Sequence, residues 1–282
     1  MSPETKPAAP FLFSIDLEDV RSMIPDGERY APRVPEATGH WLEFLARHDA
    51  RATFFAVGNV VRRNPDLIRT IRAAGHELAC HTSEHLPLDR QTALTLREDL
   101  HRNRSELEDL IGDGVVGFRA PIFSLGQSAE WAFDVIRELG FRYSSSVLPA
   151  TGLLHGWDRF STAAVRLPSG LWEFPLTTGG LLGLRVPFAG GVYFRLLPLW
   201  VLRRWFRSAA RSGQPIVSYF HPYDLDTAQE RFQHPELGGS RILNQLMYIG
   251  RGSLVARLDR LVGEGLRIER FIDCVDRLES GA

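Results

Sequence analysis

The strongest constraint on the fold is an alternation of short apolar runs with longer amphipathic stretches. In the first half of the chain, apolar runs typical of buried strands occupy residues 11–16, 52–57, 77–80 and 115–119. Apolar residues at helical spacing occupy residues 40–48, 65–74, 91–111 and 128–139. This rhythm predicts βα units built around a parallel sheet or barrel.

The second half of the chain is less regular. Its strand candidates are residues 171–176, 216–220 and 266–271, and its helix candidates lie near 196–212 and 253–263. Gly75, Gly112 and Gly140 stand where helix C-caps are expected in the first half. Segments rich in proline and glycine at 24–35, 149–156 and 177–191 are predicted to be long loops of one domain, because no repeat or low-complexity linker divides the chain.

Composition excludes several classes of protein. The 282 residues carry 33 basic and 34 acidic side chains, so no basic field favours binding to a nucleic acid. Cys80 and Cys274 stand far apart and form no disulfide framework. The first residues lack a secretion signal, which leads us to expect a cytoplasmic protein. The apolar region 181–206 is broken by arginine and proline, so it cannot span a bilayer.

Three carboxylates gather where the first predicted strand ends, in the segment 14–19 that reads Ser-Ile-Asp-Leu-Glu-Asp. Residues two apart on a strand share a face, so Asp16 and Glu18 converge, and Asp19 can bend toward the same point. Like charges this close repel unless a cation or a shared proton compensates. The segment indicates either a cation site or a solvated acidic loop that caps a helix.

A histidine pair follows a later predicted strand, in the segment 77–85 that reads Glu-Leu-Ala-Cys-His-Thr-Ser-Glu-His. On a helical turn this spacing places His81 and His85 on one face, and neutral imidazole is a common zinc ligand. Two histidines and one carboxylate leave room for a water whose pKa the metal lowers. Alone, such a pair is more often a feature of a surface helix. It is not the metalloprotease helix motif, because Thr82 follows His81.

Two further strand ends carry single basic side chains. Arg119 precedes a turn fixed by Pro121, and its forked guanidinium can hold a carboxylate in one orientation. His221 ends the apolar run 216–220, where it could act as a general acid. A surface arginine and a capping histidine are the ordinary alternatives. In series with the carboxylates and the histidine pair, however, they match barrel enzymes, which place their chemistry at the C-terminal ends of strands.

On these motifs the sequence resembles the polysaccharide deacetylases, also called carbohydrate esterase family four. The resemblance runs from about Phe11 to Asp224 and includes the scaffold segments 52–55 and 73–78. It is strongest for the branch whose first motif reads Asp-x-Glu-Asp, whose members often accompany genes for exopolysaccharide or lipid-linked glycan assembly. The resemblance implies an α/β fold, a single irregular (β/α)7-type barrel over residues 11–282, after a disordered tail at 1–10.

The resemblance also implies roles for individual residues. Asp16 matches the catalytic base, Arg119 the residue that orients this base, and His221 the general acid. His81 and His85 match ligands of one divalent metal ion, which we expect to be Zn²⁺. The implied reaction is metal-dependent hydrolysis of the N-acetyl amide of an amino sugar, with release of acetate.

Two departures from the family pattern affect these roles. Better-known members have two adjacent aspartates, of which the second is a metal ligand, and Leu17 occupies that place here. Glu18 could replace it on the same strand face, and Asp19 could replace it by charge and proximity, with a slight preference for Asp19. Where related sequences often read Tyr-Asp-Ser-Ser, residues 143–146 read Tyr-Ser-Ser-Ser. An acid that could pair with His221 is thus missing, unless Glu173 or Asp224 substitutes.

The substrate pocket is expected to include Pro121, Ile122, Phe123 and Trp172, with a backbone N–H near Ile122 facing the oxyanion. The family pattern has an aromatic residue where this sequence has Ile122. Here the aromatic residue comes one position later, at Phe123. Trp172 could stack on a sugar ring, although aromatic residues in apolar surroundings more often belong to the core.

The expected partner is an acetylated amino sugar on a nucleotide or a carrier lipid. A lipid-linked substrate would bring the protein to the inner face of the membrane, where the region 181–205 could dock, although a buried helix with an arginine rim explains that region as well. One alternative function is that of a metal-independent hydrolase of cyclic amides or ureides, as found in the same superfamily. Another is a glycan-binding relative that has lost catalysis with the missing acid at Ser144.

Overall fold

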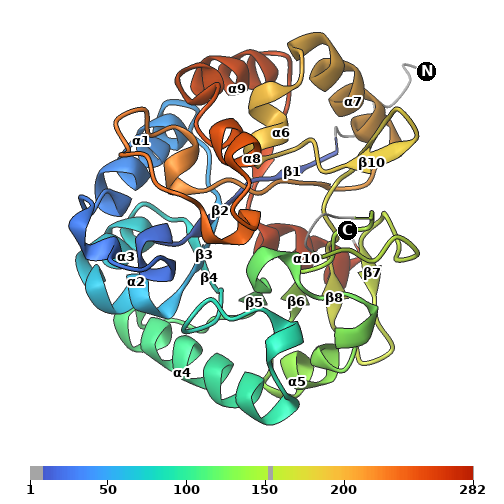
Figure 1. The fold of residues 1–282 in the computed structure, drawn as a ribbon. Helices are drawn as coiled ribbons and strands as arrows, with labels where there is room; N and C mark the ends of the chain where they lie inside the picture. The colour runs from blue at the N-terminus through green and yellow to red at the C-terminus, as the bar shows by residue number, and fades with distance from the viewer. Residues whose placement is uncertain (1–8, 152–154, 282) are drawn as a thin grey trace.

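The computed structural model describes residues 9–151 and 155–281 as a ring of short, mostly parallel strands surrounded by helices (Figure 1). The predicted α/β class and barrel architecture are confirmed. Most of the predicted tail, residues 1–8, lies outside the described residues, as do residues 152–154 of one predicted loop.

The strands are β1 (Phe11–Leu12), β2 (Ser14–Leu17), β3 (Thr53–Ala56), β4 (Glu77–Cys80), β5 (Gly117–Phe118), β6 (Tyr143–Ser144), β7 (Val165–Arg166), β8 (Trp172–Glu173), β9 (Gly179–Leu181), β10 (Leu184–Val186), β11 (Ile216–Val217) and β12 (Ile268–Glu269). The α-helices are α1 (Val34–Arg47), α2 (Gly58–Arg63), α3 (Pro65–Ala73), α4 (Ala93–Ile111), α5 (Ala132–Glu138), α6 (Gly191–Leu196), α7 (Leu199–Ser212), α8 (Arg241–Leu246), α9 (Leu254–Gly263) and α10 (Phe271–Ser280).

Two sheets form the ring. The larger has the strand order β2-β3-β4-β5-β6-β8-β7, and the smaller has the order β11-β1-β12. They join on one side, because β1 and β2 follow each other directly and Ile15 bridges Phe220. On the other side, between β8 and β11, the described residues form no ladder, and Val217 N donates to Thr177 Oγ1 at 2.8 Å. We call this interruption of the ring the seam.

The core has two parts because successive strand residues point to opposite faces. Inside the ring, Phe55, Tyr143, Phe174 and Phe271 form an aromatic cluster in which Tyr143 stacks on Phe271 at a centroid distance of 5.3 Å. Phe271 belongs to α10, which therefore packs against the interior. Outside the strands, a larger cluster fills the space beneath the helices. Each large apolar side chain buried this way stabilises the fold by roughly 1.5–3 kcal/mol.

Several sequence predictions are confirmed in detail. The helix predicted at 91–111 is α4, and the helices α3, α5, α7 and α9 also lie where helical spacing placed them. Gly75, Gly112 and Gly140 follow α3, α4 and α5 with positive φ angles of 82°, 65° and 86°. Only glycine adopts this conformation at low cost, which explains why these helices stop there. Cys80 and Cys274 form no disulfide, as expected, and both are buried.

Other predictions were wrong in their limits. The segment 177–191, predicted as a loop, contains the antiparallel hairpin β9–β10. The segment 24–35, also predicted as a loop, includes the start of α1 at Val34. The strand predicted at 266–271 is short, because α10 already begins at Phe271. Helices α2, α6, α8 and α10 were not predicted.

Candidate active site

The predicted functional residues meet at one end of the ring. Asp16 lies in β2, Glu18 directly follows it, His81 directly follows β4, and Arg119 directly follows β5. His221 follows Phe220, which bridges β2. Parallel strands deliver their C-terminal ends to the same opening, so residues far apart in sequence become neighbours. Asp16, Glu18, His81 and Arg119 are all buried.

Arg119 is a fully buried charge with no exposed surface. Its Nη1 donates to Asp16 Oδ1 at 2.6 Å and to Ser14 Oγ at 2.8 Å. Its Nε donates to Ser145 O at 3.0 Å, and its Nη2 donates to Ser145 Oγ at 3.0 Å and Ser218 O at 3.3 Å. A guanidinium has five N–H groups, so these five bonds use its donor capacity. Arg119 thus fixes Asp16 in one orientation.

Aromatic rings complete the surroundings of this arginine. The guanidinium carbon lies 4.1 Å from the ring centroid of Phe55 and 5.3 Å from that of Phe123. The ring faces carry negative potential and attract the cation. The interior cluster therefore forms the floor of the site, and the charged pair of Arg119 and Asp16 forms its centre.

A second cluster adjoins the first and consists of Glu18, His81 and His85. Each residue offers one ligand atom, and these atoms lie within 4.8 Å of one another. His81 Nδ1 lies 2.8 Å from Arg119 O, and a carbonyl only accepts, so Nδ1 carries the proton and Nε2 is left with a lone pair. His85 Nε2 lies 2.8 Å from Glu18 Oε2. The donor set and the orientation of His81 fit a divalent cation such as zinc.

The protonation states agree with this use. Burial lowers the pKa of His81 to about 4, against the opposing charges of Asp16 and Glu18, so its imidazole is neutral near pH 7. Burial alone raises the pKa of Glu18, but His85, His221 and His81 outweigh it and lower the pKa to about 2. A neutral imidazole and an ionised carboxylate are the forms that bind metals.

The histidine pair is not on a helix, contrary to the expectation from its spacing. Residues 81–87 form a loop in which Thr82 and His85 have positive φ angles of 64° and 54°. Such angles are costly for these residue types and persist only where surroundings impose them. Asp99 of α4 holds the loop, because Ser83 N donates to Asp99 Oδ1 at 2.7 Å. The two imidazoles converge through this strained loop, with ring centroids 5.0 Å apart.

Asp19, the residue preferred from the sequence as third ligand, is absent from the cluster. Its carboxylate binds the guanidinium of Arg21, with Nη2 at 2.6 Å from Oδ2 and Nε at 3.0 Å from Oδ1. It also accepts from Arg21 N and so begins the short 3-10 helix Val20–Met23. The structure therefore favours Glu18, the alternative from strand alternation, because the carboxylate of Asp19 is already used.

His221 stands across from Glu18, with its Nε2 at 3.7 Å from Glu18 Oε1. Its Nδ1 lies 3.1 Å from Asp224 Oδ2, and that oxygen also accepts from His221 N at 2.8 Å. Asp224 in turn forms a buried ion pair with Arg195 Nε at 3.1 Å. Burial lowers the pKa of His221, but the bond to Asp224 and the charges of Glu18, Asp224 and Asp16 raise it to about 9.

Asp224 thus pairs with the histidine in place of the acid missing at Ser144. Glu173, the other substitute considered from the sequence, has a different position. It lies opposite Ser144 in the β6–β8 register, and its Oε1 accepts from Ser146 N and Val147 N at 2.8 and 3.0 Å. This buried carboxylate supports the turn that carries Ser145, and through it Arg119. Of the two substitutes considered from the sequence, Asp224 is thus the one that contacts His221.

The residues expected at the substrate differ in their surroundings. Ile122 and Phe123 have positive φ angles of 46° and 53° in the turn after Pro121, an unusual conformation for an isoleucine. Phe123 meets Tyr219 edge to face at 5.3 Å, beside the charged centre. Trp172 packs against the interior cluster near Phe174. Trp172 is thus partly buried against the core, and its place at the substrate stays a prediction.

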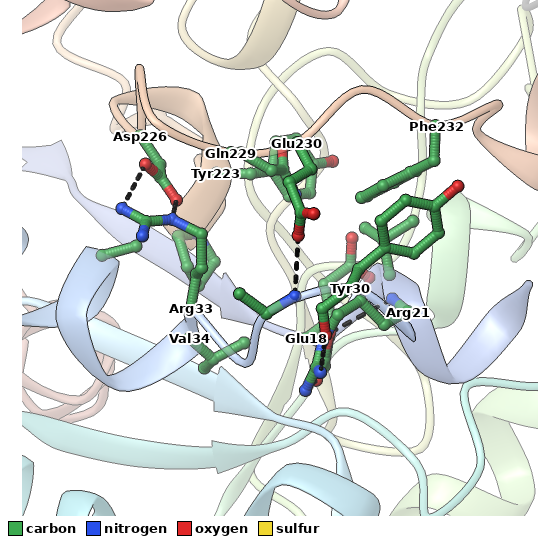
Figure 2. Close-up of a pocket in the computed structure, with 15 residues that line it drawn as sticks. Glu18, Arg21, Tyr30, Arg33, Val34, Tyr223, Asp226, Gln229, Glu230 and Phe232 are labelled. Carbon is green, nitrogen blue, oxygen red and sulfur yellow. Dashed lines mark hydrogen bonds and ion pairs between the residues drawn. The ribbon is translucent and has the colours of Figure 1, made fainter. Parts of the chain in front are cut away.

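A pocket beside Glu18 lies between the loop before α1 and the loop after His221 (Figure 2). Two contacts clamp these loops together. Arg33 Nε bonds to Asp226 Oδ2 at 2.6 Å, and Ala31 N donates to Glu230 Oε2 at 2.7 Å. These contacts tie the loop before α1 to the loop after His221 next to Glu18.

The comparisons with known proteins match two successive parts of the chain. Residues 24–144 match the family model of polysaccharide deacetylases, and residues 145–274 match a domain of unknown function, DUF3473. The second part does not form a separate body, since it supplies β8, β11 and β12 to the same ring. The succession of the two matches fits the branch expected from the Asp-x-Glu-Asp motif.

Among curated proteins, a chitooligosaccharide deacetylase of Rhizobium leguminosarum bv. trifolii is 47% identical over 51 residues, which is 18% of this chain and 24% of that protein. The chain thus spans about a quarter of that relative's length. Among solved structures, a candidate polysaccharide deacetylase of Mycobacterium smegmatis has a TM-score of 0.67 at 19% identity, covering 99% of this chain and 96% of the other. A CE4 family pseudoenzyme of Bacillus anthracis has a TM-score of 0.51 at 12% identity, covering 95% and 66%.

The structural matches show the barrel fold, and the family match covers the part of the chain that carries the histidine pair and Arg119. The resemblance drawn from four strand-end motifs is confirmed. Residues 24–144 of this chain match the polysaccharide deacetylase family, and the described residues share their fold with a solved structure of a candidate polysaccharide deacetylase.

Proposed function

We propose that this chain hydrolyses the N-acetyl amide of an amino sugar in a glycan or glycan precursor, and that it requires one divalent metal ion. The observation that carries the proposal is the juxtaposition of two clusters. Asp16 is held by Arg119, whose N–H groups all have acceptors. This carboxylate adjoins the donor set of Glu18, His81 and His85. The family match and the chitooligosaccharide deacetylase relative support an acetylated sugar as substrate.

Glu18, His81 and His85 would hold the ion. When bound, a divalent ion of this kind polarises an acyl carbonyl and lowers the pKa of a water molecule toward neutrality. Zinc suits a set of two imidazoles and one carboxylate, because such sites keep a position open for water. Arg119 O holds His81 Nδ1 and so keeps Nε2 available as a ligand.

The protein's own groups would then move the protons. Asp16 accepts a proton from the attacking water, and its Oδ1 stays fixed by Arg119 while this happens. The water oxygen bonds to the acetyl carbon, and the C–N bond breaks. His221 donates its Nε2 proton to the leaving nitrogen, so that acetate and a free amine result. The backbone N–H of Ile122 would stabilise the negative charge that develops on the carbonyl oxygen, a contribution of about 3 kcal/mol for such a donor.

We further propose that the acetylated sugar is carried on a nucleotide or a lipid, in the cytoplasm. The Asp-x-Glu-Asp motif and the second family match support the branch associated with glycan assembly. None of the helices in the described ranges combines the length and apolar character needed to cross a bilayer.

The test is acetate release from acetylated nucleotide sugars, lipid-linked sugars and chitin-type oligomers, measured with the purified chain before and after chelation. We expect release from one substrate class, loss after chelation and recovery when Zn²⁺ is restored. Release that survives complete metal removal would favour the metal-independent alternative, a cyclic amide or ureide hydrolase. Binding of the acetylated sugar with no release from any class would favour a non-catalytic relative, like the pseudoenzyme that shares the fold.

A further inference from the structure

A groove of about 660 Å³ lies on the outer wall of the ring at the seam, and it shares no residue with the catalytic clusters. One wall is the base of the β9–β10 hairpin, and the other is α7. The two walls are in contact at Gly179. A Cβ atom at this position would lie only 2.5 Å from the indole ring of Trp205. Residues 162–163 and 212–215 close the ends of the groove.

The groove is lined by cations without acids. Arg185, Arg204 and Arg211 are exposed along it, and no aspartate or glutamate is among its lining residues. The neighbouring Arg203 and Arg207 differ, since both pair with Glu264. The ion pairs found across the described residues include none of the three groove arginines. Thr178 and Ser208, which carry hydroxyl groups, also line the groove. Guanidinium and hydroxyl donors together suit a phosphate group.

Apolar side chains project next to these arginines. At the tip of the hairpin, Leu182 is 96% exposed and Leu184 is 65% exposed, directly beyond Arg185. On α7, Trp200 is 69% exposed and lies one turn before Arg204. Exposed leucines and tryptophan beside unpaired arginines are typical of surfaces that insert into the headgroup region of a membrane. Figure 1 shows the hairpin and α7 at the same edge of the molecule.

We propose that this surface, the seam groove with the hairpin tip, docks the protein on a bilayer of anionic phospholipids. The arginines bind lipid phosphates, while Leu182, Leu184 and Trp200 enter the boundary of the acyl chains. Charge complementarity decides the occupant, because three arginines that form no ion pair within the described residues, of which Arg185 donates only to Pro149 O, match an anionic lipid surface and repel a basic protein partner. The inference is independent of the proposed reaction, since the groove and the catalytic clusters have separate residues.

The experiment is cosedimentation of the full chain with vesicles of phosphatidylcholine alone and vesicles in which half of the lipid is phosphatidylglycerol. We expect binding to the anionic vesicles only, weakening as salt rises, because salt screens exposed charges. Arg204→Gln with Arg211→Gln should lower the partition coefficient about 25-fold, at about fivefold for each arginine near an anionic surface. Inorganic phosphate at millimolar concentration should not release the protein from vesicles if the apolar tip contributes.

A matched pair of variants separates this surface from general charge and hydrophobicity. Leu184→Ser with Arg204→Gln alters the surface, and Leu94→Ser with Arg102→Gln removes a leucine of equal 65% exposure and an exposed arginine from α4, on the opposite side of the ring. The first should lose at least about tenfold in binding, whereas the second should stay within about twofold of the unmodified protein. Equal losses in both, release by inorganic phosphate alone, or no binding to anionic vesicles would overturn the proposal. Acetate release from a soluble oligomer, measured on the same proteins, reports separately on the reaction.

Discussion

The two charged clusters at the mouth of the ring differ in how their polar atoms are used. Around Arg119, each N–H of the guanidinium has an acceptor in the protein, and the charge is balanced by Asp16. In the neighbouring cluster, Glu18, His81 and His85 turn their ligand atoms toward one another. The first cluster is complete within the protein, whereas the second has the composition of a cation site. The difference supports the proposal that Arg119 positions Asp16 and that the Glu18 cluster would hold a divalent ion.

The largest expected effect is a loss of activity without a loss of metal, which would distinguish the Arg119 cluster from the Glu18 cluster. Asp16→Asn should lower the rate of acetate release by about 10² to 10⁴, the usual contribution of a general base. Because Asp16 is not in the ligand set, the variant should still bind one metal ion per chain. Metal analysis and kinetics on the same sample check both points. Loss of metal together with activity would mean that Asp16 belongs to the ion site.

The next effect concerns stability. Arg119→Met leaves Asp16 as a buried charge without a partner, which should lower the free energy of unfolding by about 3–5 kcal/mol. Adding Asp16→Asn to this variant should restore part of the loss, because the unpaired charge is gone. Arg62→Met is the control: it breaks ion pairs with Glu84 and Glu106 whose arginine is 40% exposed, and should cost only about 1 kcal/mol. Urea titration measures the free energy of unfolding of all three variants. Equal losses of stability in Arg62→Met and Arg119→Met would contradict the account.

A smaller effect concerns the proton of His221. Asp224→Asn removes a charge and a charged acceptor that raise the pKa of this histidine, so the value should fall below about 9 toward the ordinary range. The imidazole would then lose its proton at lower pH than in the unmodified protein. NMR titration of the histidine rings in the metal-free protein follows this change. Asp226→Asn is the matched control, because Asp226 pairs with Arg33 instead. An equal shift of the His221 pKa in both variants would show that Asp224 is not the specific partner of His221.

The residue pattern predicted βα units around a parallel sheet or barrel, because the alternation of short apolar runs with amphipathic stretches depends only on local sequence. The family resemblance then implied the barrel. The sequence also predicted which residues share the site, since strand ends of a parallel barrel face one opening. It could not decide between Glu18 and Asp19, because the answer depends on Arg21, whose side chain takes the carboxylate of Asp19. Likewise, the convergence of His81 and His85 depends on a strained loop held by Asp99, which spacing does not reveal.

The hairpin β9–β10 and helix α10 show a second reason for missed structure. The hairpin is rich in glycine and has three exposed leucines, so its pattern does not resemble a strand with one buried face. Helix α10 begins one residue after β12, and Phe271 lies inside the ring. Its N-cap residue, Arg270, makes no capping hydrogen bond, so the sequence carries no typical helix-start signal there. Tertiary packing determines both elements more than local sequence does.

The most direct test of the central claim compares two neighbouring carboxylates. Glu18→Gln and Asp19→Asn each replace one carboxylate by its amide, and metal bound per chain is measured for both after loading with Zn²⁺ and removal of excess. We expect Glu18→Gln to lose the ion and acetate release, because Glu18 supplies the only carboxylate of the described ligand set. We expect Asp19→Asn to keep both, since Asp19 serves Arg21. Retained metal in Glu18→Gln with loss in Asp19→Asn would contradict the account.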